Sequence, residues 1–275
     1  YNEIATTPAQ LPRMLQAALQ HAVHKKGVAV LGLPGDITSL PAIAAETTTA
    51  LFRNHTVVIP SEDELMQLAT LINLNKKVTI YCGLGAADAH TEIIQLAEKL
   101  KAPVAYSYKA KMAIQYDNPY EVGLTGLLGI PSAYHSMHEC ELLVLLGTDF
   151  PYTPFIPIEN KIVQIDIKPE TLGRRAKLDM GLYGDVKDTL KALIPMIEIK
   201  EDTTFLDFQL EFYKEVKKNL LTYVNDPGKP NAIHPEVVVS IINELSAKDA
   251  IFTIDTGMCC VWAARYIDGT GERKM

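Results

Sequence analysis

The sequence predicts an α/β fold: a central doubly wound, mostly parallel sheet with helices on both faces, flanked by partial α/β segments. The first observation is that short apolar runs alternate with segments of helical periodicity from residue 61 to residue 198. The second is that the run from Leu142 to Leu146 is apolar at every position, which is typical of a parallel strand covered on both faces. Such sheets bind ligands beyond the carboxyl ends of their strands.

The composition narrows the class of protein. The 275 residues carry a formal charge of −7 and are 48% hydrophobic, so the chain is globular and its acidity argues against binding nucleic acid by neutralising phosphates. No apolar stretch approaches the roughly 18 to 20 residues that span a bilayer. Four cysteines match neither a disulfide framework nor a CxxC zinc site, which indicates a reducing, cytoplasmic location. The first residue, Tyr1, indicates a piece of a longer polypeptide.

Residues 1–60 are predicted to be the end of one α/β domain followed by a linker. Thr7 and Gln10 have the spacing of a capping box, and apolar residues then recur at helical spacing, so we expect a helix over 8–24. The apolar run 28–33 predicts a strand buried on both faces, with no strand before the helix.

Residues 61–198 are predicted to be a complete central domain. Ser61 and Glu64 form a second capping box at the start of a helix. The alternation that follows predicts strands at 77–82, 104–107, 142–146 and 162–167, and helices at 88–100, 132–139 and 186–197.

Two further segments follow this domain. Residues 199–230 are predicted to be a bridging helix and a linker that breaks at Asp226. Residues 231–275 are predicted to begin another α/β domain, with a helix from Pro235 and a strand at 251–254. One strand-turn-helix unit cannot bury its own sheet, so the chain is expected to be cut at both ends around the central domain.

Glycines follow the first central strand at Gly83 and Gly85, directly before a predicted helix. Glycines in this context let the backbone approach a phosphate at a helix N-terminus. The third glycine of a GxGxxG motif is replaced by Asp88, so a tight turn explains the loop equally well. Lys109 and Lys111 lie in the loop that follows the predicted strand 104–107. They either contact phosphates or keep the loop soluble.

Three further loops are predicted at carboxyl edges of the sheet: a glycine-rich loop, the polar loop 147–152 that follows the predicted strand 142–146, and the loop at Asp166. A glycine-rich loop precedes the helix at Pro131, and its backbone amides are suited to an anion. Asp166 ends a strand and resembles the acidic residue that binds a ribose in dinucleotide folds. Together the loops predict a dinucleotide site, whose candidate residues are Thr125, Gly126, Leu127, Leu128, Thr148, Asp149, Phe150, Pro151, Tyr152 and Asp166.

A last candidate, Asp255-Thr256-Gly257, closes the predicted strand 251–254. From the local pattern it is either a contact with a phosphate or metal, or a capped turn.

The motifs together resemble bacterial quinone-dependent pyruvate dehydrogenase, also called pyruvate oxidase, a family of enzymes that use thiamine diphosphate and FAD. The resemblance runs over nearly the whole chain. It rests on Val-Leu-Gly-Leu-Pro-Gly-Asp at 30–36, Tyr-Asp-Asn-Pro-Tyr at 116–120, Thr-Gly-Leu at 125–127, Gly-Thr-Asp-Phe-Pro-Tyr at 147–152, Gln-Ile-Asp-Ile at 164–167, Ala-Ile-Phe-Thr at 250–253 and Val-Trp-Ala-Ala-Arg-Tyr at 261–266.

The resemblance implies a three-domain subunit. Residues 1–60 would end a pyrimidine-binding domain, 61–198 would be the FAD domain, and 231–275 would begin the diphosphate-binding domain. The family's FAD contacts fall on 125–128, on 148–152 and on Asp166, with Gly83 and Gly85 as weaker candidates. Its thiamine diphosphate contact falls on Asp255, Thr256 and Gly257.

The resemblance also implies a reaction: oxidative decarboxylation of pyruvate to acetate and CO2, with electrons passed through FAD to a quinone. The parent is expected to be a cytoplasmic homotetramer, peripheral on the inner face of the cell membrane. The activating glutamate is expected upstream of Tyr1, and the motif that binds magnesium (Mg2+) and diphosphate lies beyond this chain. We therefore expect neither a catalytic residue nor a metal ligand here, and no turnover by this polypeptide alone.

Two alternatives stay open. One is a carboligase similar to acetolactate synthase, whose FAD takes no redox part. The other is a non-catalytic nucleotide-binding or oligomerisation module. The sequence also leaves the electron acceptor open between a quinone and dioxygen.

Overall fold

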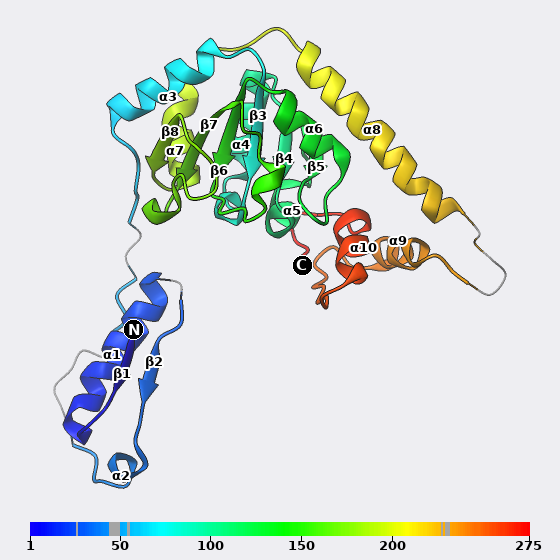
Figure 1. Cartoon of the computed structure of the whole chain (residues 1–275). Helices are drawn as coiled ribbons and strands as arrows, with labels where there is room; N and C mark the ends of the chain where they lie inside the picture. Colours follow the sequence, from blue (N-terminus) through cyan, green and yellow to red (C-terminus); the bar gives the residue numbers. More distant parts are fainter. Residues whose placement is uncertain (26, 44–49, 54–55, 227, 229–231) are drawn as a thin grey trace. The chain divides into compact units, whose positions relative to one another are not determined.

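The computed structural model describes the chain except for residues 26, 44–49, 54–55, 227 and 229–231 (Figure 1). The chain divides into two compact units, residues 1–56 and residues 57–275. Each unit is described by itself.

The first unit is a parallel βαβ arrangement. β1 (Asn2–Ile4) pairs with β2 (Val30–Gly32), and they are connected through a 3-10 turn (Pro8–Gln10) and α1 (Leu11–Lys25). A short helix, α2 (Gly35–Thr38), follows. The capping box is present, since the Gln10 Oε1 accepts a hydrogen bond from the Thr7 amide at 3.2 Å.

Two predictions for this unit are wrong. A strand, β1, does precede the helix. The prediction missed it because β1 is only three residues long and mostly polar, so it gives no apolar run. The strand at 28–33 is not buried on both faces, since Val30 is 50% exposed. A two-stranded sheet with one helix leaves the other face of its strands open.

The second unit contains a six-stranded sheet in the order β5-β4-β3-β6-β7-β8, with every neighbouring pair parallel. This confirms the predicted α/β fold with a parallel sheet. The strands are β3 (Val78–Cys82), β4 (Val104–Tyr106), β5 (Glu121–Leu124), β6 (Leu142–Leu146), β7 (Lys161–Asp166) and β8 (Met180–Tyr183).

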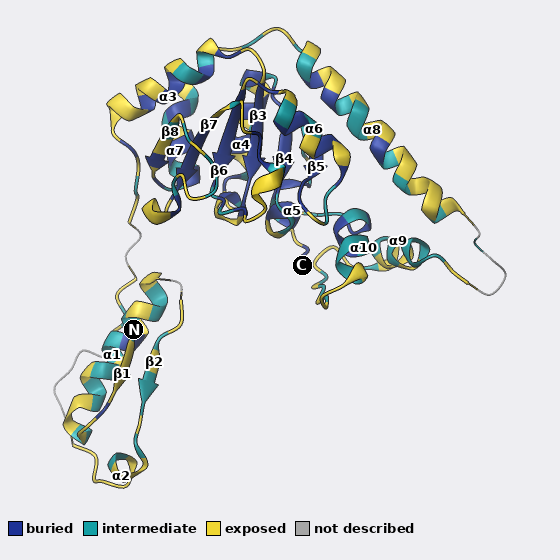
Figure 2. Ribbon diagram, viewed as in Figure 1, coloured by how far each residue is buried: buried dark blue, intermediate teal, exposed yellow. Residues whose placement is uncertain are grey.

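Helices cover both faces of this sheet. On one face, α3 (Glu62–Leu74), α4 (His90–Leu100) and α7 (Val186–Leu193) form a hydrophobic core with alternate residues of the strands, such as Ile80 and Val144. On the other face, α6 (Pro131–Glu139) packs on the opposite alternates, such as Tyr81 and Leu145. The sheet is accordingly the buried layer between exposed helix surfaces (Figure 2).

The predictions missed two strands, β5 and β8. Each has four residues, and each contains a glycine, Gly123 or Gly181, that interrupts the apolar pattern. The loop after β4 also contains a 3-10 turn (Tyr108–Ala110) and a short helix, α5 (Lys111–Ile114).

The rest of the unit is helical. α8 (Thr204–Asn225) contacts α6 and β5 and leads to α9 (Pro235–Leu245) and α10 (Met258–Tyr266). The strand predicted at 251–254 is wrong: this segment makes a single bridge, between Ile251 and Lys274, because no neighbouring strand in the described part of the chain extends the pairing. Among the described residues, no helix is long and apolar enough to cross a membrane.

Candidate functional site

The carboxyl ends of the central strands bring three predicted loops together. β3 and β6 are neighbours, so the loop after Cys82 lies beside the loop after Leu146. The Gly83 amide donates to the Leu146 carbonyl at 2.8 Å, and the Gly85 amide donates to the Gly147 carbonyl at 2.9 Å. The glycine loop and the 147–152 loop therefore form one packed edge.

Gly83 and Gly85 are explained by this packing. A Cβ atom built on Gly83 would lie 2.3 Å from the Gly147 carbonyl oxygen, and one on Gly85 would lie 2.9 Å from the Gly147 Cα. A side chain at either position would force the two loops apart. The close approach of two backbones accounts for both glycines without a ligand, and their contact with a nucleotide stays a prediction.

The loop from Thr125 to Gly129 has unused hydrogen-bond donors. It turns at Gly126, where φ is +100°, and closes where the Gly129 amide donates to the Gly126 carbonyl at 2.9 Å. Thr125 is 3% exposed, and its hydroxyl has no partner among the described residues. Within the same described part of the chain, the amides of residues 126–128 donate to no protein acceptor. This loop can therefore donate to an anion or a ribose.

Aromatic side chains of the 148–152 loop lie against this glycine turn. A Cβ atom built on Gly126 would lie 3.0 Å from the Phe150 ring and 3.5 Å from the Tyr152 ring. Phe150 is buried, whereas Tyr152 is 40% exposed, and their ring centroids are 5.4 Å apart. The structure thus brings the predicted residues of the two loops together, with an aromatic surface beside free amides.

Asp149, whose contact with FAD stays a prediction, has cationic partners in the structure. Its carboxylate forms ion pairs with Arg174 and with Arg175, the latter at 2.9 Å. The sequence reasoning missed both arginines, which lie in a short polar loop after β7. Adjacent arginines in a loop beyond a carboxyl edge are the signal that was available.

Asp166 lies where it was predicted, at the carboxyl end of β7. It is 6% exposed, and its Oδ1 accepts a hydrogen bond from the Lys168 amide at 2.9 Å. This bond holds the carboxylate at the edge of the sheet. Contact with a ribose stays a prediction.

The turn Asp255-Thr256-Gly257 is exposed and leads directly into α10. The Thr256 amide donates to the Asp255 Oδ1 at 2.7 Å. Gly257 has φ of +138°, and no atom lies within 4 Å of a Cβ atom built on it. The glycine is required by its backbone conformation, and the space beside it is open.

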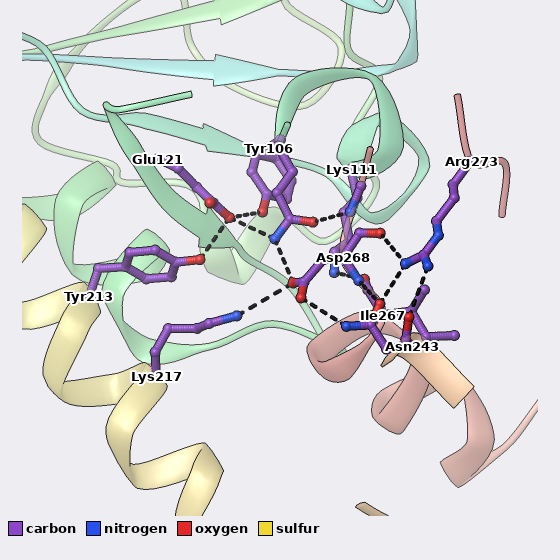
Figure 3. Close-up of polar contacts among 11 residues, drawn as sticks. Tyr106, Lys111, Glu121, Tyr213, Lys217, Asn243, Ile267, Asp268 and Arg273 are labelled. Carbon is purple, nitrogen blue, oxygen red and sulfur yellow. Dashed lines mark hydrogen bonds and ion pairs between the residues drawn. The ribbon is translucent and has the colours of Figure 1, made fainter. Parts of the chain in front are cut away.

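A polar cluster that the sequence reasoning missed lies between the sheet and the C-terminal segment (Figure 3). Glu121 Oε1 accepts hydrogen bonds from the hydroxyls of Tyr106 and Tyr213 and from the Gln115 side-chain amide. Burial and the nearby Glu121 carboxylate raise the pKa of both tyrosines above its usual value. The partners are up to 92 residues apart in sequence, so no local pattern indicates them.

Lys111 belongs to the same cluster. It is 1% exposed and donates to the Ile267 carbonyl. Both predictions for Lys111, a phosphate contact and a solubilising residue, are therefore wrong. The pKa of Lys111 is lowered to about 8, chiefly by burial; nearby Asp268 and Glu121 oppose the shift, whereas Lys217 adds to it.

Asp268 connects the cluster to the C-terminal segment. Its carboxylate accepts from Gln115 at 3.3 Å and from Asn243 at 3.0 Å, and it lies 3.6 Å from the Lys217 Nζ. In the described ranges, no group of three or more His, Cys, Asp or Glu side chains is placed to hold a metal ion.

The part of the chain that contains the sheet is similar to a known domain family. Residues 65–193 match the model of the thiamine pyrophosphate enzyme central domain. The matched range begins in α3 and ends with α7, so it contains the whole six-stranded sheet and both loops of the candidate edge.

Relatives are similar to this chain over most of its length. An uncharacterized 42.6 kDa protein of Pseudomonas amyloderamosa is 44% identical over 80% of this chain and 56% of its own length. The putative thiamine pyrophosphate-containing protein YdaP of Bacillus subtilis is 31% identical over 97% of this chain and 46% of its own length. Pyruvate oxidase of Lactiplantibacillus plantarum is 25% identical over 100% of this chain and 46% of its own length.

Acetolactate synthase large subunits are similar as well, at 24 to 28% identity. The chain spans about half the length of the curated relatives named above.

Proposed function

Because residues 65–193 match the model of the thiamine pyrophosphate enzyme central domain, we propose that the whole protein is a thiamine-diphosphate-dependent pyruvate oxidoreductase whose central sheet binds FAD. The proposed reaction is oxidative decarboxylation of pyruvate to acetate and CO2. Similarity to pyruvate oxidase over the full chain supports the choice of substrate.

One observation carries the FAD part of the proposal. The Thr125–Gly129 loop combines a buried, unpartnered hydroxyl with three amides that have no protein acceptor among the described residues, and it lies beside Phe150 and Tyr152. Buried polar groups are normally satisfied, so an unsatisfied one at a ligand-binding edge indicates a missing partner. The phosphate and ribose oxygens of a dinucleotide supply such acceptors.

The chain's residues would bind and orient the two organic cofactors. Thiamine diphosphate supplies carbanion stabilisation and FAD supplies two-electron redox chemistry. Thr125 and the amides of residues 126–128 would donate to FAD, and Asp166 would accept from its ribose. The exposed Asp255–Gly257 turn would contact thiamine diphosphate, and we propose no ligand of its magnesium ion within this chain.

The remaining parts of the proposal concern the whole protein. We propose that its FAD passes electrons to a quinone, that it forms a homotetramer, and that it is cytoplasmic and peripheral on the inner face of the cell membrane. These rest on the resemblance of the ordered motifs at 30–36, 116–120, 147–152 and 261–266. The chain described here is expected to give no turnover on its own.

The similarity to acetolactate synthases supports a second candidate, a carboligase that holds FAD without reducing it. The visible spectrum of the purified whole protein distinguishes the two. With thiamine diphosphate, magnesium and anaerobic pyruvate, bleaching of the yellow flavin band is the expected result. A flavin that stays oxidised would favour the carboligase, and a protein that retains no flavin would favour a non-catalytic module.

The substitution Asp166→Ala tests the ribose contact. We expect FAD retention to weaken by about 1 to 3 kcal/mol, because one or two hydrogen bonds to a carboxylate are lost. Equilibrium dialysis against FAD measures the change, and Glu170→Ala, which removes an exposed carboxylate from the following loop, is the matched control. Equal affinity in the two variants would remove Asp166 from the site.

A further inference from the structure

α10 joins the two candidate cofactor elements. Its first residue, Met258, directly follows the Asp255–Gly257 turn. Its last turn contains Arg265, whose guanidinium Nη2 donates to the Gly129 carbonyl at 2.9 Å and whose Nε donates to the Leu128 carbonyl at 3.3 Å. One short helix therefore begins at the candidate thiamine diphosphate turn and ends on the candidate FAD loop.

The same end of α10 is held from a second direction. The buried ammonium of Lys111 donates to the carbonyl of Ile267, which is the C-cap residue of the helix (Figure 3). A cation at this position satisfies a carbonyl that the helix leaves free and complements the helix dipole. The Gly269 amide also donates to the Gln115 Oε1 at 2.9 Å. These contacts hold the C-terminal end of α10 against α5 and against Gln115, the residue that follows α5.

Arg265 binds the end of the Thr125–Gly129 loop, where the hydrogen bonds that close the loop are made. A trans peptide directs its carbonyl and its amide in opposite directions. With the Leu128 and Gly129 carbonyls on Arg265, the following amides, of Gly129 and Ile130, point back to the Gly126 and Leu124 carbonyls, each at 2.9 Å. The two contacts with the guanidinium thus stabilise the turn that leaves the amides of residues 126–128 unpaired.

We infer that Arg265 is a positioning residue: by binding two consecutive carbonyls it keeps the Thr125–Gly129 loop ready for FAD and in register with the Asp255–Gly257 turn. The inference rests on the proposed function for the identity of the two ligands. The role requires an arginine, because a guanidinium presents several donors in a rigid plane and can bind two carbonyls at once. A lysine ammonium is a point donor on a flexible stem.

The first test needs no cofactor. Hydrogen–deuterium exchange is measured on the full chain for wild type, Arg265→Ala, Arg265→Lys and the control Lys214→Ala, which removes an exposed cation of α8. We expect Arg265→Ala to speed exchange of the Gly129 and Ile130 amides about tenfold or more, because both charge-assisted hydrogen bonds from the guanidinium to the loop are lost. Exchange in β3 and β6 should stay as in wild type, with Arg265→Lys intermediate at the loop.

The second test is FAD affinity, measured by quenching of flavin fluorescence with the same variants. Arg265→Ala should bind FAD about tenfold more weakly while its thermal midpoint stays close to that of wild type. Arg265→Lys should recover part of the affinity. If Arg265→Ala does not fold, Arg265→Lys and Arg265→Gln replace it in both tests.

The outcomes separate the inference from the function on which it rests. Wild-type exchange at Gly129 and Ile130 in Arg265→Ala would overturn the positioning role. A rise in exchange spread equally over the sheet would overturn it too, because it would indicate a general loss of stability. If the wild-type whole protein itself binds no FAD, the FAD part of the proposed function fails, whereas the exchange test still decides whether Arg265 orders the loop.

Discussion

Both units of the chain contain strands within apolar runs, but these strands are buried in the second unit and partly exposed in the first. In the second unit, β3 and β6 are buried at every position, since helices cover both faces of the six-stranded sheet. In the first unit, the run around β2 leaves Val30 50% exposed and Leu33 47% exposed. Among the described residues of this unit, only Ala5 and Ala18 are buried hydrophobic side chains.

The difference shows that, within this chain, an apolar run is buried only where other elements of the chain cover its strand. A parallel βα unit with one helix covers one face of its strands, whereas the central sheet has helices on both. The central unit therefore holds most of the hydrophobic free energy of folding, and the substitutions below test this contrast.

The largest expected effect is on a buried leucine of the central sheet. Leu146→Ala should lower the free energy of unfolding by about 2 to 5 kcal/mol, because Leu146 is 0% exposed and its truncation leaves a cavity in the core. Leu33→Ala, at 47% exposure, should change it by about 0.5 kcal/mol or less. Urea unfolding followed by circular dichroism measures both. Equal losses would show that the first unit has a core as tight as the second.

Local sequence signals predicted most of the fold. Ser61 and Glu64 form the predicted capping box, with the Ser61 amide 2.8 Å from the Glu64 Oε2, because a cap depends on residues three apart. The central strands were predicted because their apolar runs are continuous. β5 and β8 were missed because strands of four residues that contain glycine are recognised only by their neighbours in the sheet.

The second expected effect is a change of stability with pH that arises from the buried ammonium of Lys111. The pKa of Lys111 is about 8 in the folded chain against 10.5 for an unperturbed lysine, so between these values the unfolded state binds more protons than the folded state. Stability from this group therefore rises with pH across this window. Relative to Lys111→Met, wild type should gain roughly 3 kcal/mol at most between about pH 8 and pH 10.5.

The matched control is Lys25→Met, which removes an exposed ammonium from α1 of the first unit. Urea unfolding at a series of pH values gives the stability gap between wild type and each variant. A gap between wild type and Lys111→Met that stays constant over this window would show that Lys111 keeps its ordinary pKa in the folded chain.

The candidate site was predictable only where it depends on strand ends. Residues 148–152 follow a predicted strand and Asp166 ends one, so their common edge follows from the topology; residues 125–128 were predicted from their glycines before the helix at Pro131, since the strand they follow, β5, was missed. The partners of these loops could not be predicted, because Arg265 is 137 residues from Leu128, and Tyr213 is 92 residues from Glu121. Contacts of this kind depend on how α8 and α10 pack, and no short sequence window contains that information.

The smallest of the three effects compares glycines that differ in the space around them. Neither Gly83 nor Gly35 has a positive φ, so alanine can adopt either backbone. Alanine at Gly83 would place its Cβ 2.3 Å from the Gly147 carbonyl oxygen, and separating the two loops should cost about 1 to 3 kcal/mol. Gly35 begins α2 with nothing within 4 Å of a built Cβ, so Gly35→Ala should be neutral or stabilise by up to about 1 kcal/mol. Thermal unfolding of both variants measures the contrast, and a Gly83→Ala protein as stable as wild type would show that the loops after β3 and β6 have room to separate, as a ligand entering between them would require.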